Sequence, residues 1–173
     1  DTAQAIGSDF TSAKGWIKKV GTIGDIGCTS FFPSKNLGCY GDGGAIFTNN
    51  DDLAEKITSI ANHGMEVRYY HDRIGVNSRL DTIQAAVLRT KLPHLDNYNK
   101  ARRKAADYYD KAFENCSKIK TPTRSKFSTH TFHQYTLVLN NVDRKALMEH
   151  LSSKGIASAV YYPVALHNQK AFQ

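Results

Sequence analysis

The sequence has few cysteines, no long apolar run and no targeting signal among its first residues. Its three cysteines, Cys28, Cys39 and Cys116, are too few and too scattered for a disulfide framework, and they lack the paired spacing of a zinc site. No apolar run approaches the roughly 20 residues of a membrane-spanning helix. Residues 1–4 show neither the basic start nor the apolar stretch of a signal peptide. These absences predict a soluble cytoplasmic protein with reduced thiols and no membrane contact.

The net charge of the chain is strongly positive. It is +7 at pH 7, with a sequence pI near 9.3. Such a charge suits either nucleic acid or anionic small-molecule substrates. The densest basic cluster, residues 100–104, lies in a helical pattern that also contains acidic residues, which is typical of a solvated helix face. No nucleic-acid-binding motif accompanies the cluster. We therefore expect no nucleic-acid partner. The histidines show no metal-ligand pattern, so we expect no metal either.

Strand and helix patterns alternate through the first two thirds of the chain. Residues 28–32 and 44–48 are apolar runs typical of buried strands, with a glycine-rich loop between them. Asp52, followed by Glu55, predicts a capping box that opens a helix ending near Gly64. Another helix is expected over residues 81–92, and Pro93 interrupts it. A long helix follows, and we expect its apolar stripe to face the core; the stripe comprises Leu95, Tyr98, Ala105, Tyr109 and Phe113.

A different pattern begins after a polar stretch at residues 118–131. Residues 132–139 alternate like a strand, Asp143 caps a helix ending at Lys154–Gly155, and residues 157–162 form a second predicted strand. We therefore expect a partial large α/β domain over residues 1–118, including the long helix, and a partial, smaller α+β domain over residues 119–173. The sequence also starts as if at the end of a strand and stops within a segment, so we expect a fragment.

The stretch most informative about chemistry is TSFFPSKNLG, residues 29–38. A strand ends near Ser30, and Lys35 follows five residues later in a loop with Pro33 and several glycines. A lysine amine that is fixed and partly desolvated can attack a carbonyl group to form a Schiff base. A glycine-rich loop allows a flat, bulky cofactor to approach the backbone. By itself, a lysine in such a loop is more often simply solvated.

Similarity to the DegT–DnrJ–StrS group of sugar aminotransferases extends over nearly the whole chain. Its main block is GDIGCTSFFPSKNLGCYGDGGAIFTNNDDLAEKI, residues 24–57, followed by HGMEVRYYHDRIGVNSRLDTIQAAVLRTKLPHLD, residues 63–96. Residues 1–7 resemble the aspartate loop of the group, and residues 161–167 resemble its C-terminal motif. The blocks occur in family order. The resemblance implies a fold-type I transferase that depends on pyridoxal 5'-phosphate.

The resemblance assigns cofactor roles to four residues of the first block and the aspartate loop. Lys35 matches the lysine that forms the internal aldimine and later moves the proton. Asp1 matches the carboxylate that keeps the pyridine nitrogen protonated, so that the ring accepts electrons. Gln4 matches the residue beside the ring hydroxyl, and Ser30 matches a phosphate ligand. Without the motif, Asp1 would be interpreted as a frayed terminal residue.

The resemblance also implies a shared site and substrate contacts. Asn77 matches a phosphate ligand that the family supplies from the neighbouring subunit, so a homodimer is expected. Arg79 matches the arginine that meets the anionic part of the substrate, and its planar guanidinium suits a diphosphate. A salt bridge from Arg79 to Asp81 at the helix start is the alternative interpretation. Tyr161 and His167 are further candidates for substrate contact, with a packed tyrosine and a structural histidine as the alternatives. His133 also resembles the family, but no role is assigned to it.

The implied reaction moves an amino group from an amino acid, usually glutamate, to a keto sugar on a nucleotide diphosphate. In this family, such products enter cell-surface polysaccharides or glycoconjugates. Relatives that dehydrate sugars with the same cofactor replace the lysine with histidine, so Lys35 favours amino transfer. Cyclic polyols or aminobenzoate precursors remain alternative acceptors. A regulatory nucleic-acid-binding protein and a catalytically inactive fragment of the family remain alternative functions.

Overall fold

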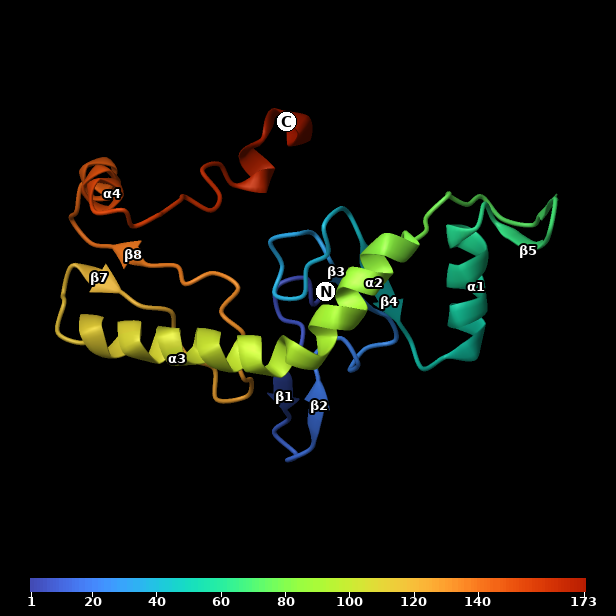
Figure 1. Cartoon of the computed structure of the whole chain (residues 1–173), viewed down its shortest axis with the longest axis horizontal. Helices are drawn as coiled ribbons and strands as arrows, with labels where there is room; N and C mark the ends of the chain where they lie inside the picture. The colour runs from blue at the N-terminus through green and yellow to red at the C-terminus, as the bar shows by residue number, and fades with distance from the viewer. The chain divides into compact units, whose positions relative to one another are not determined.

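The computed structural model describes residues 1–173, and the chain divides into two compact units (Figure 1). The first unit comprises residues 1–112 and 122–136, and the second comprises residues 113–121 and 137–173. Residues 122–136, which the sequence patterns grouped with the smaller domain, are thus part of the first unit. The domain boundary near residue 119 stays a prediction. Both units contain helices and strands, so the chain is a mixed α/β structure.

The strands of the first unit form three antiparallel pairs. They are β1 (Asp9–Thr11) with β2 (Ile17–Lys19), β3 (Gly27–Ser30) with β4 (Gly44–Phe47), and β5 (Met65–Val67) with β6 (Tyr70–His71). β3 and β4 confirm the two strands expected around residues 28–32 and 44–48, but the expected burial of the second is wrong, since Ile46 of β4 is 55% exposed. The β3–β4 ladder runs from the Gly27–Phe47 pair to the Ser30–Gly44 pair. It is continued by a hydrogen bond of 2.7 Å from Phe31 N to Gly43 O.

The first helix, α1 (Asp51–Ala61), begins slightly earlier than the sequence patterns indicated. Its N-cap is Asn50, whose Oδ1 accepts a hydrogen bond from Leu53 N at 3.0 Å, so the capping box expected from Asp52 and Glu55 is wrong. Asp51 and Asp52 instead occupy the first turn, where carboxylates interact favourably with the helix dipole.

Pro93 interrupts the next helical stretch as expected. α2 (Thr82–Lys91) is followed by one 3-10 turn, η1 (Leu92–His94), and then by α3 (Leu95–Phe113). Proline has no N–H to donate, so the backbone tightens for one turn and resumes as an α-helix. Figure 1 shows α2 and α3 following each other with a change of direction at this turn.

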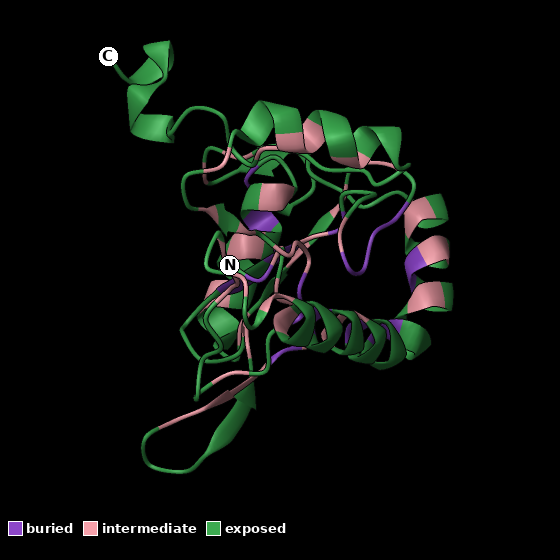
Figure 2. Ribbon diagram, turned by 90° about the vertical axis from the view of Figure 1, so that its left-hand side faces the viewer, coloured by how far each residue is buried: buried purple, intermediate pink, exposed green.

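The buried face of α3 differs from the expected aromatic stripe. Leu95, Asn99 and Ala106 are buried, whereas Tyr98 and Tyr109 are 40% and 43% exposed. The expectation that both tyrosines belong to the core is therefore wrong. Spacings of four and seven residues place the three buried positions on one side of the helix. The core cluster itself is small: it consists of Phe31, Leu37, Cys39, Leu88 and Leu95. Figure 2 shows buried residues as short stretches between long exposed ones.

The second unit contains one short strand pair and one α-helix. β7 (Ile119–Lys120) pairs antiparallel with β8 (Val138–Leu139), and α4 (Arg144–Ser153) follows. The last helical segments are the 3-10 turns η2 (Leu166–Asn168) and η3 (Lys170–Phe172). None of the helices combines the length and the apolar composition that a membrane-spanning segment needs.

Two predicted strands of the C-terminal third are largely wrong. Of residues 132–139, only Val138 and Leu139 pair in a ladder. Phe132 has a positive φ of 46°, and its N–H donates a hydrogen bond to His130 Nδ1 at 2.9 Å. The backbone at Phe132 is therefore not extended. Residues 157–162 form no strand, because no other strand of the chain pairs with them. An alternating sequence pattern becomes a strand only when a neighbouring strand satisfies its backbone groups.

The predicted cap of α4 is confirmed and gives a stability prediction. Asp143 Oδ1 accepts hydrogen bonds from Lys145 N at 2.9 Å and Ala146 N at 3.1 Å. Asp143→Ala should lower the local stability of α4 by about 1 kcal/mol and speed amide exchange in its first turn roughly five-fold. Hydrogen exchange read by mass spectrometry measures this change, and Asp143→Ser, which keeps a capping oxygen, is the control. Unchanged exchange in the alanine variant would mean that the cap does not stabilise the helix.

Candidate functional site

Lys35 lies in a tight turn between β3 and β4. Its N–H donates to Phe32 O at 2.8 Å, and Cys39 N donates back to Phe31 O at 2.8 Å. A Cβ at Gly38 would lie 2.4 Å from Pro33 O, so only glycine allows the turn to close this tightly. Lys91 Nζ of α2 binds Gly38 O from outside the turn. The local sequence thus fixes the backbone around the lysine.

The side chain of Lys35 is half-buried, and its amine has no partner. No ion pair of the chain involves Lys35, and no side-chain hydrogen bond reaches its Nζ. A half-buried amine without a carboxylate partner is available to react, in contrast to a lysine held in a structural salt bridge.

Two other predicted site residues lie on a segment bound to β3 and to the region of the Lys35 turn. Thr2, between Asp1 and Gln4, donates to Cys28 O through its N–H at 2.7 Å and its Oγ1 at 3.0 Å. Gln4 O accepts from Thr131 Oγ1 at 2.9 Å. Asp1 is exposed, and its Oδ1 accepts from Ala3 N at 2.8 Å, which turns the carboxylate toward its own backbone. Asp1 is therefore held by local contacts, unlike a frayed end.

Ser30 ends β3 and is half-buried. Its Oγ accepts a hydrogen bond from Phe32 N at 3.2 Å, which leaves the hydroxyl hydrogen free to donate. The structure thus brings Ser30, the Lys35 turn and residues 1–4 into one hydrogen-bonded region. A hydroxyl donor, a primary amine and a carboxylate are the groups that this region offers.

A buried polar cluster next to Lys35 was missed by sequence reasoning. Asn36 Nδ2 donates to Asn99 Oδ1 at 2.9 Å and lies 3.3 Å from Thr131 O. Asn36 Oδ1 lies 3.0 Å from His133 Nδ1. The contacts join positions 63 to 97 residues apart in the chain. Helical spacing on α3 gave no signal for them, because the predicted apolar stripe does not include Asn99.

His133 lies close enough to Lys35 for their charges to interact. Burial, with smaller contributions from the positive charges of Lys35 and Arg102, lowers the pKa of His133 below its ordinary value. The imidazole is therefore neutral at pH 7. Its resemblance to the family was the one available sequence signal, and it suggested no role.

Asn77 and Arg79 lie in a different part of the first unit, next to the end of α1. Asn77 is exposed and forms an isolated antiparallel bridge with Asn62. Arg79 is exposed and takes part in none of the ion pairs of the chain, so the alternative salt bridge to Asp81 is absent. Asp81 instead serves as the N-cap position of α2 without a side-chain hydrogen bond. The guanidinium of Arg79 is free to bind another molecule.

Tyr161 and His167 belong to the second unit. Tyr161 is 58% exposed and contacts the ring of Tyr162, and His167 lies in η2 with an exposed side chain. Their exposure argues against the interpretation as a packed tyrosine and a structural histidine. Their predicted substrate contacts stay predictions.

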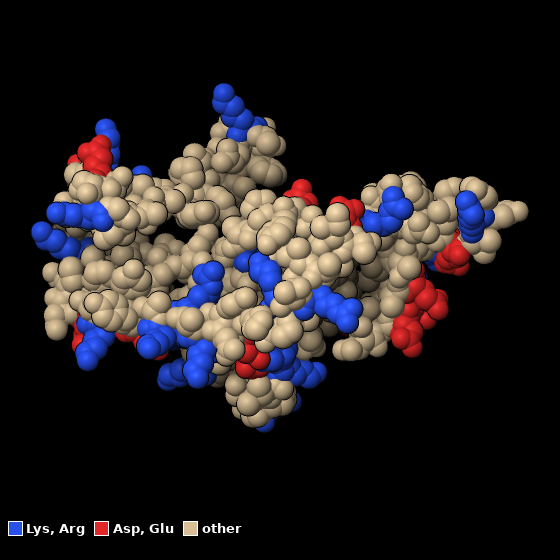
Figure 3. Space-filling view, in the orientation of Figure 1, with Lys and Arg blue, Asp and Glu red and all other residues tan.

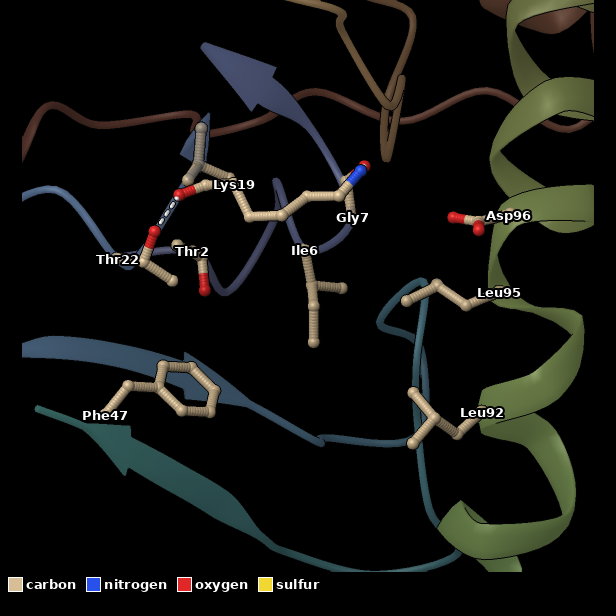
Figure 4. A pocket seen from close by; sticks show the side chains of 10 residues that line it. Thr2, Ile6, Gly7, Lys19, Thr22, Phe47, Leu92, Leu95 and Asp96 are labelled. Carbon is tan, nitrogen blue, oxygen red and sulfur yellow. Dashed lines mark hydrogen bonds between the residues drawn. The ribbon is translucent and has the colours of Figure 1, made fainter. Parts of the chain in front are cut away.

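A pocket of about 310 Å³ lies in the first unit (Figure 4). Figure 4 shows Ile6, Phe47, Leu92 and Leu95 around it, with Asp96 at one side. It includes Thr2, which lies between Asp1 and Gln4, but neither Lys35 nor Ser30. Its walls are mainly apolar, and its charged lining residues are Lys19 and Asp96.

The charges of the surface show no single binding patch on the face in view. Figure 3 shows acidic side chains gathered over α1, whereas basic side chains occur over several other elements. No group of three or more His, Cys, Asp or Glu side chains could hold a metal ion.

Comparison with known proteins finds relatives that match nearly the whole chain. A UDP-N-acetyl-3-dehydro-alpha-D-glucosamine 3-aminotransferase of Acidithiobacillus ferrooxidans is 45% identical over 172 residues, covering 99% of this chain and 44% of that protein. A pleiotropic regulatory protein of Geobacillus stearothermophilus is 46% identical over 174 residues, covering 99% of this chain and 45% of that protein. The chain thus spans less than half the length of these relatives.

The fold agrees with that of solved sugar aminotransferases. The crystal structure of an aminotransferase from Brucella abortus matches with a TM-score of 0.89 and 41% identity, over 99% of this chain and 44% of that one. This likeness confirms fold-type I over part of the relatives' length. The crystal structure of NtdA from Bacillus subtilis, which is 33% identical with a TM-score of 0.78 over 87% of this chain and 36% of that one, contains the bound cofactor PMP. The sequence model of the DegT/DnrJ/EryC1/StrS aminotransferase family matches residues 1–173. The chain belongs to the DegT/DnrJ/EryC1/StrS aminotransferase family.

Proposed function

We propose that the chain provides the lysine-bearing part of a nucleotide-sugar aminotransferase. The enzyme moves an amino group from an amino acid, such as glutamate, to a keto sugar linked to a nucleotide diphosphate. One observation supports this most strongly: the half-buried amine of Lys35 has no partner, and backbone hydrogen bonds close the turn before and after Lys35. That is the condition for condensation with an aldehyde, in which the amine nitrogen bonds to the carbonyl carbon and water is released.

The residues of this region fit pyridoxal phosphate. When bound, the cofactor supplies a protonated pyridine ring that accepts the electrons released at the substrate carbon. Asp1 offers the carboxylate that holds a proton on a ring nitrogen, and the free hydroxyl hydrogen of Ser30 suits a phosphate oxygen. Gln4, whose backbone is bound by Thr131, offers an amide for the ring hydroxyl. Lys35 also acts as the base that takes up and returns the proton during amino transfer.

We further propose that two copies of the chain share each site. Asn77 lies in an exposed apolar surface, since Ile74 is 99% exposed, Val76 is 56% exposed, and Tyr69 and Tyr70 are exposed as well. Such a surface is expected to be covered by another protein surface. A two-fold axis through this apolar surface would place Asn77 of each copy against the other copy of the chain. The two sites formed in this way would be equivalent.

The proposed function is tested by amination of nucleotide keto sugars. The full-length gene product, loaded with pyridoxal phosphate, should aminate at least one member of a panel of such sugars with glutamate as donor. The product is detected by mass spectrometry. A protein that binds the cofactor and converts glutamate, but aminates only cyclic polyols, would contradict the proposed acceptor class.

Arg79→Ala is expected to weaken the acceptor half-reaction. The guanidinium is exposed and unpaired, and a hydrogen bond to a charged group contributes about 1.5–3 kcal/mol. The keto-sugar half-reaction should therefore slow by roughly ten- to a hundred-fold, while the glutamate half-reaction, which involves no nucleotide, changes little. Stopped-flow absorbance follows each half-reaction separately. Arg89→Ala, which removes an exposed arginine from α2, is the control. Equal slowing of both half-reactions by Arg79→Ala would assign Arg79 to structure or to the cofactor.

A further inference from the structure

We infer that Asn36 and His133 are positioning residues for Lys35, acting through the buried cluster that joins the Lys35 turn to α3 and to residues 130–135. The inference rests on the proposed function, because it assigns these two side chains the task of holding the amine that binds the cofactor. Neither residue is proposed to touch the cofactor.

Three members of the cluster are buried more deeply than any predicted site residue, and His133 is half-buried. Asn36, Asn99 and Thr131 are 4%, 1% and 1% exposed. Asn36 immediately follows Lys35, so a movement of its side chain moves the lysine backbone. A buried amide holds its position strongly, because leaving its polar atoms without partners is costly. No buried side-chain nitrogen or oxygen of the chain lacks a hydrogen bond. The Lys35 turn is therefore fixed by side-chain bonds from distant segments as well as by its own backbone.

The orientation of every amide in the cluster follows from two backbone carbonyls. Asn99 contacts Ile6 O at 3.0 Å, and a carbonyl only accepts, so this atom of Asn99 is Nδ2 and its other atom is Oδ1. Asn36 faces that Oδ1 at 2.9 Å and Thr131 O at 3.3 Å, so its facing atom is Nδ2. Asn36 Oδ1 is then the atom that faces His133.

The same reasoning fixes the tautomer of His133. Because Asn36 Oδ1 only accepts, the 3.0 Å contact requires a proton on His133 Nδ1. A neutral imidazole with that proton has an unprotonated Nε2. The burial of His133 and its cationic neighbours Lys35 and Arg102 favour the neutral form. Asn36 thus keeps an uncharged ring in one orientation beside the Lys35 amine, where an imidazolium would repel a protonated nitrogen.

The test compares four variants of the full-length protein. Asn36→Ala removes the central amide, and His133→Ala removes its imidazole partner. His133→Asn restores an N–H donor the same number of bonds from Cα as Nδ1. Tyr135→Phe is the matched control: it removes the hydrogen bond from Tyr135 to Asp110, which likewise ties residues 130–135 to α3 but does not reach Lys35.

Two measurements follow each variant. Amide hydrogen exchange in the cofactor-free protein reports how firmly residues 35–37 are held, and it needs no activity. The loss of the Asn36 bonds should speed exchange there about ten-fold. Steady-state kinetics of the loaded enzyme should show kcat reduced about a hundred-fold in both alanine variants, since a small misplacement of the reactive group costs that much. The KM for glutamate should change far less. His133→Asn should recover most of kcat, and Tyr135→Phe should match the wild type in both measurements.

The outcomes separate this inference from the proposed function. If the wild-type protein forms no covalent link with pyridoxal phosphate, as judged by visible absorption, the proposed function fails and the inference fails with it. If the link forms and both alanine variants keep the wild-type kcat and exchange rates, the inference alone is overturned. Equal losses in Tyr135→Phe, or no recovery in His133→Asn, would also overturn it, since a general packing defect would then account for the effects.

Discussion

Lys35→Ala is expected to abolish the covalent link to pyridoxal phosphate and almost all amino transfer. The variant loses both the amine that condenses with the aldehyde and the base that moves the proton. Loss of a positioned acid–base group alone costs about 10²–10⁴-fold in rate, so turnover should fall by no less than that range. Visible absorption of the dialysed protein reports the link, and an assay of product formation reports turnover.

Two further substitutions make the Lys35 result specific. Lys35→Arg keeps a positive charge, but a guanidinium stays protonated and does not form the link, so this variant should be as inactive as the alanine variant. Lys56→Ala removes an exposed lysine from α1 and should leave both readouts unchanged. Retention of a stable visible chromophore by either Lys35 variant would contradict the assigned role.

Mixing two inactive variants is expected to restore activity if the sites are shared. A Lys35→Ala subunit still supplies Asn77, and an Asn77→Ala subunit still supplies Lys35. Each hybrid dimer then contains one intact site out of two. Random exchange of equal amounts gives half hybrids, so about a quarter of wild-type activity should return. The activity of the mixture, measured before and after subunit exchange, checks this prediction.

The complementation experiment requires proof that subunits exchange. Differently tagged variants that co-purify after mixing provide it, and a mixture of two Lys35→Ala preparations should stay inactive. Proven exchange without recovery of activity would show that Lys35 and Asn77 do not combine across the subunits, and the proposal of shared sites would fail.

Local sequence patterns predicted the elements whose determinants are local. Pro93 breaks the helical stretch because a proline lacks an N–H, and Asp143 caps α4 through its own side chain. The start of α1 was misassigned because Asn50, Asp51 and Asp52 are all good capping residues, and the pattern alone does not choose among them. The strands expected at 132–139 and 157–162 depend on pairing partners, which alternation does not reveal.

The candidate site was predictable in part, for a similar reason. Lys35 and Ser30 lie in one short block, so their motif and the tight turn at Gly38 are visible in the sequence. The contact between Asn36 and His133 spans 97 positions and exists only after α3 and residues 130–135 pack together. A buried asparagine on α3 also contradicts the simple rule that a helix buries its apolar face, so Asn99 gave no signal.

Borohydride reduction of the loaded full-length protein, followed by peptide mapping, tests the central claim most directly. Reduction turns the bond between the lysine nitrogen and the cofactor carbon into a stable amine, so the modified residue survives digestion. The structure predicts that a single peptide bears the label and that the label is on Lys35. Labelling of another lysine, such as Lys91 beside the same turn, or no label at all, would contradict the assignment.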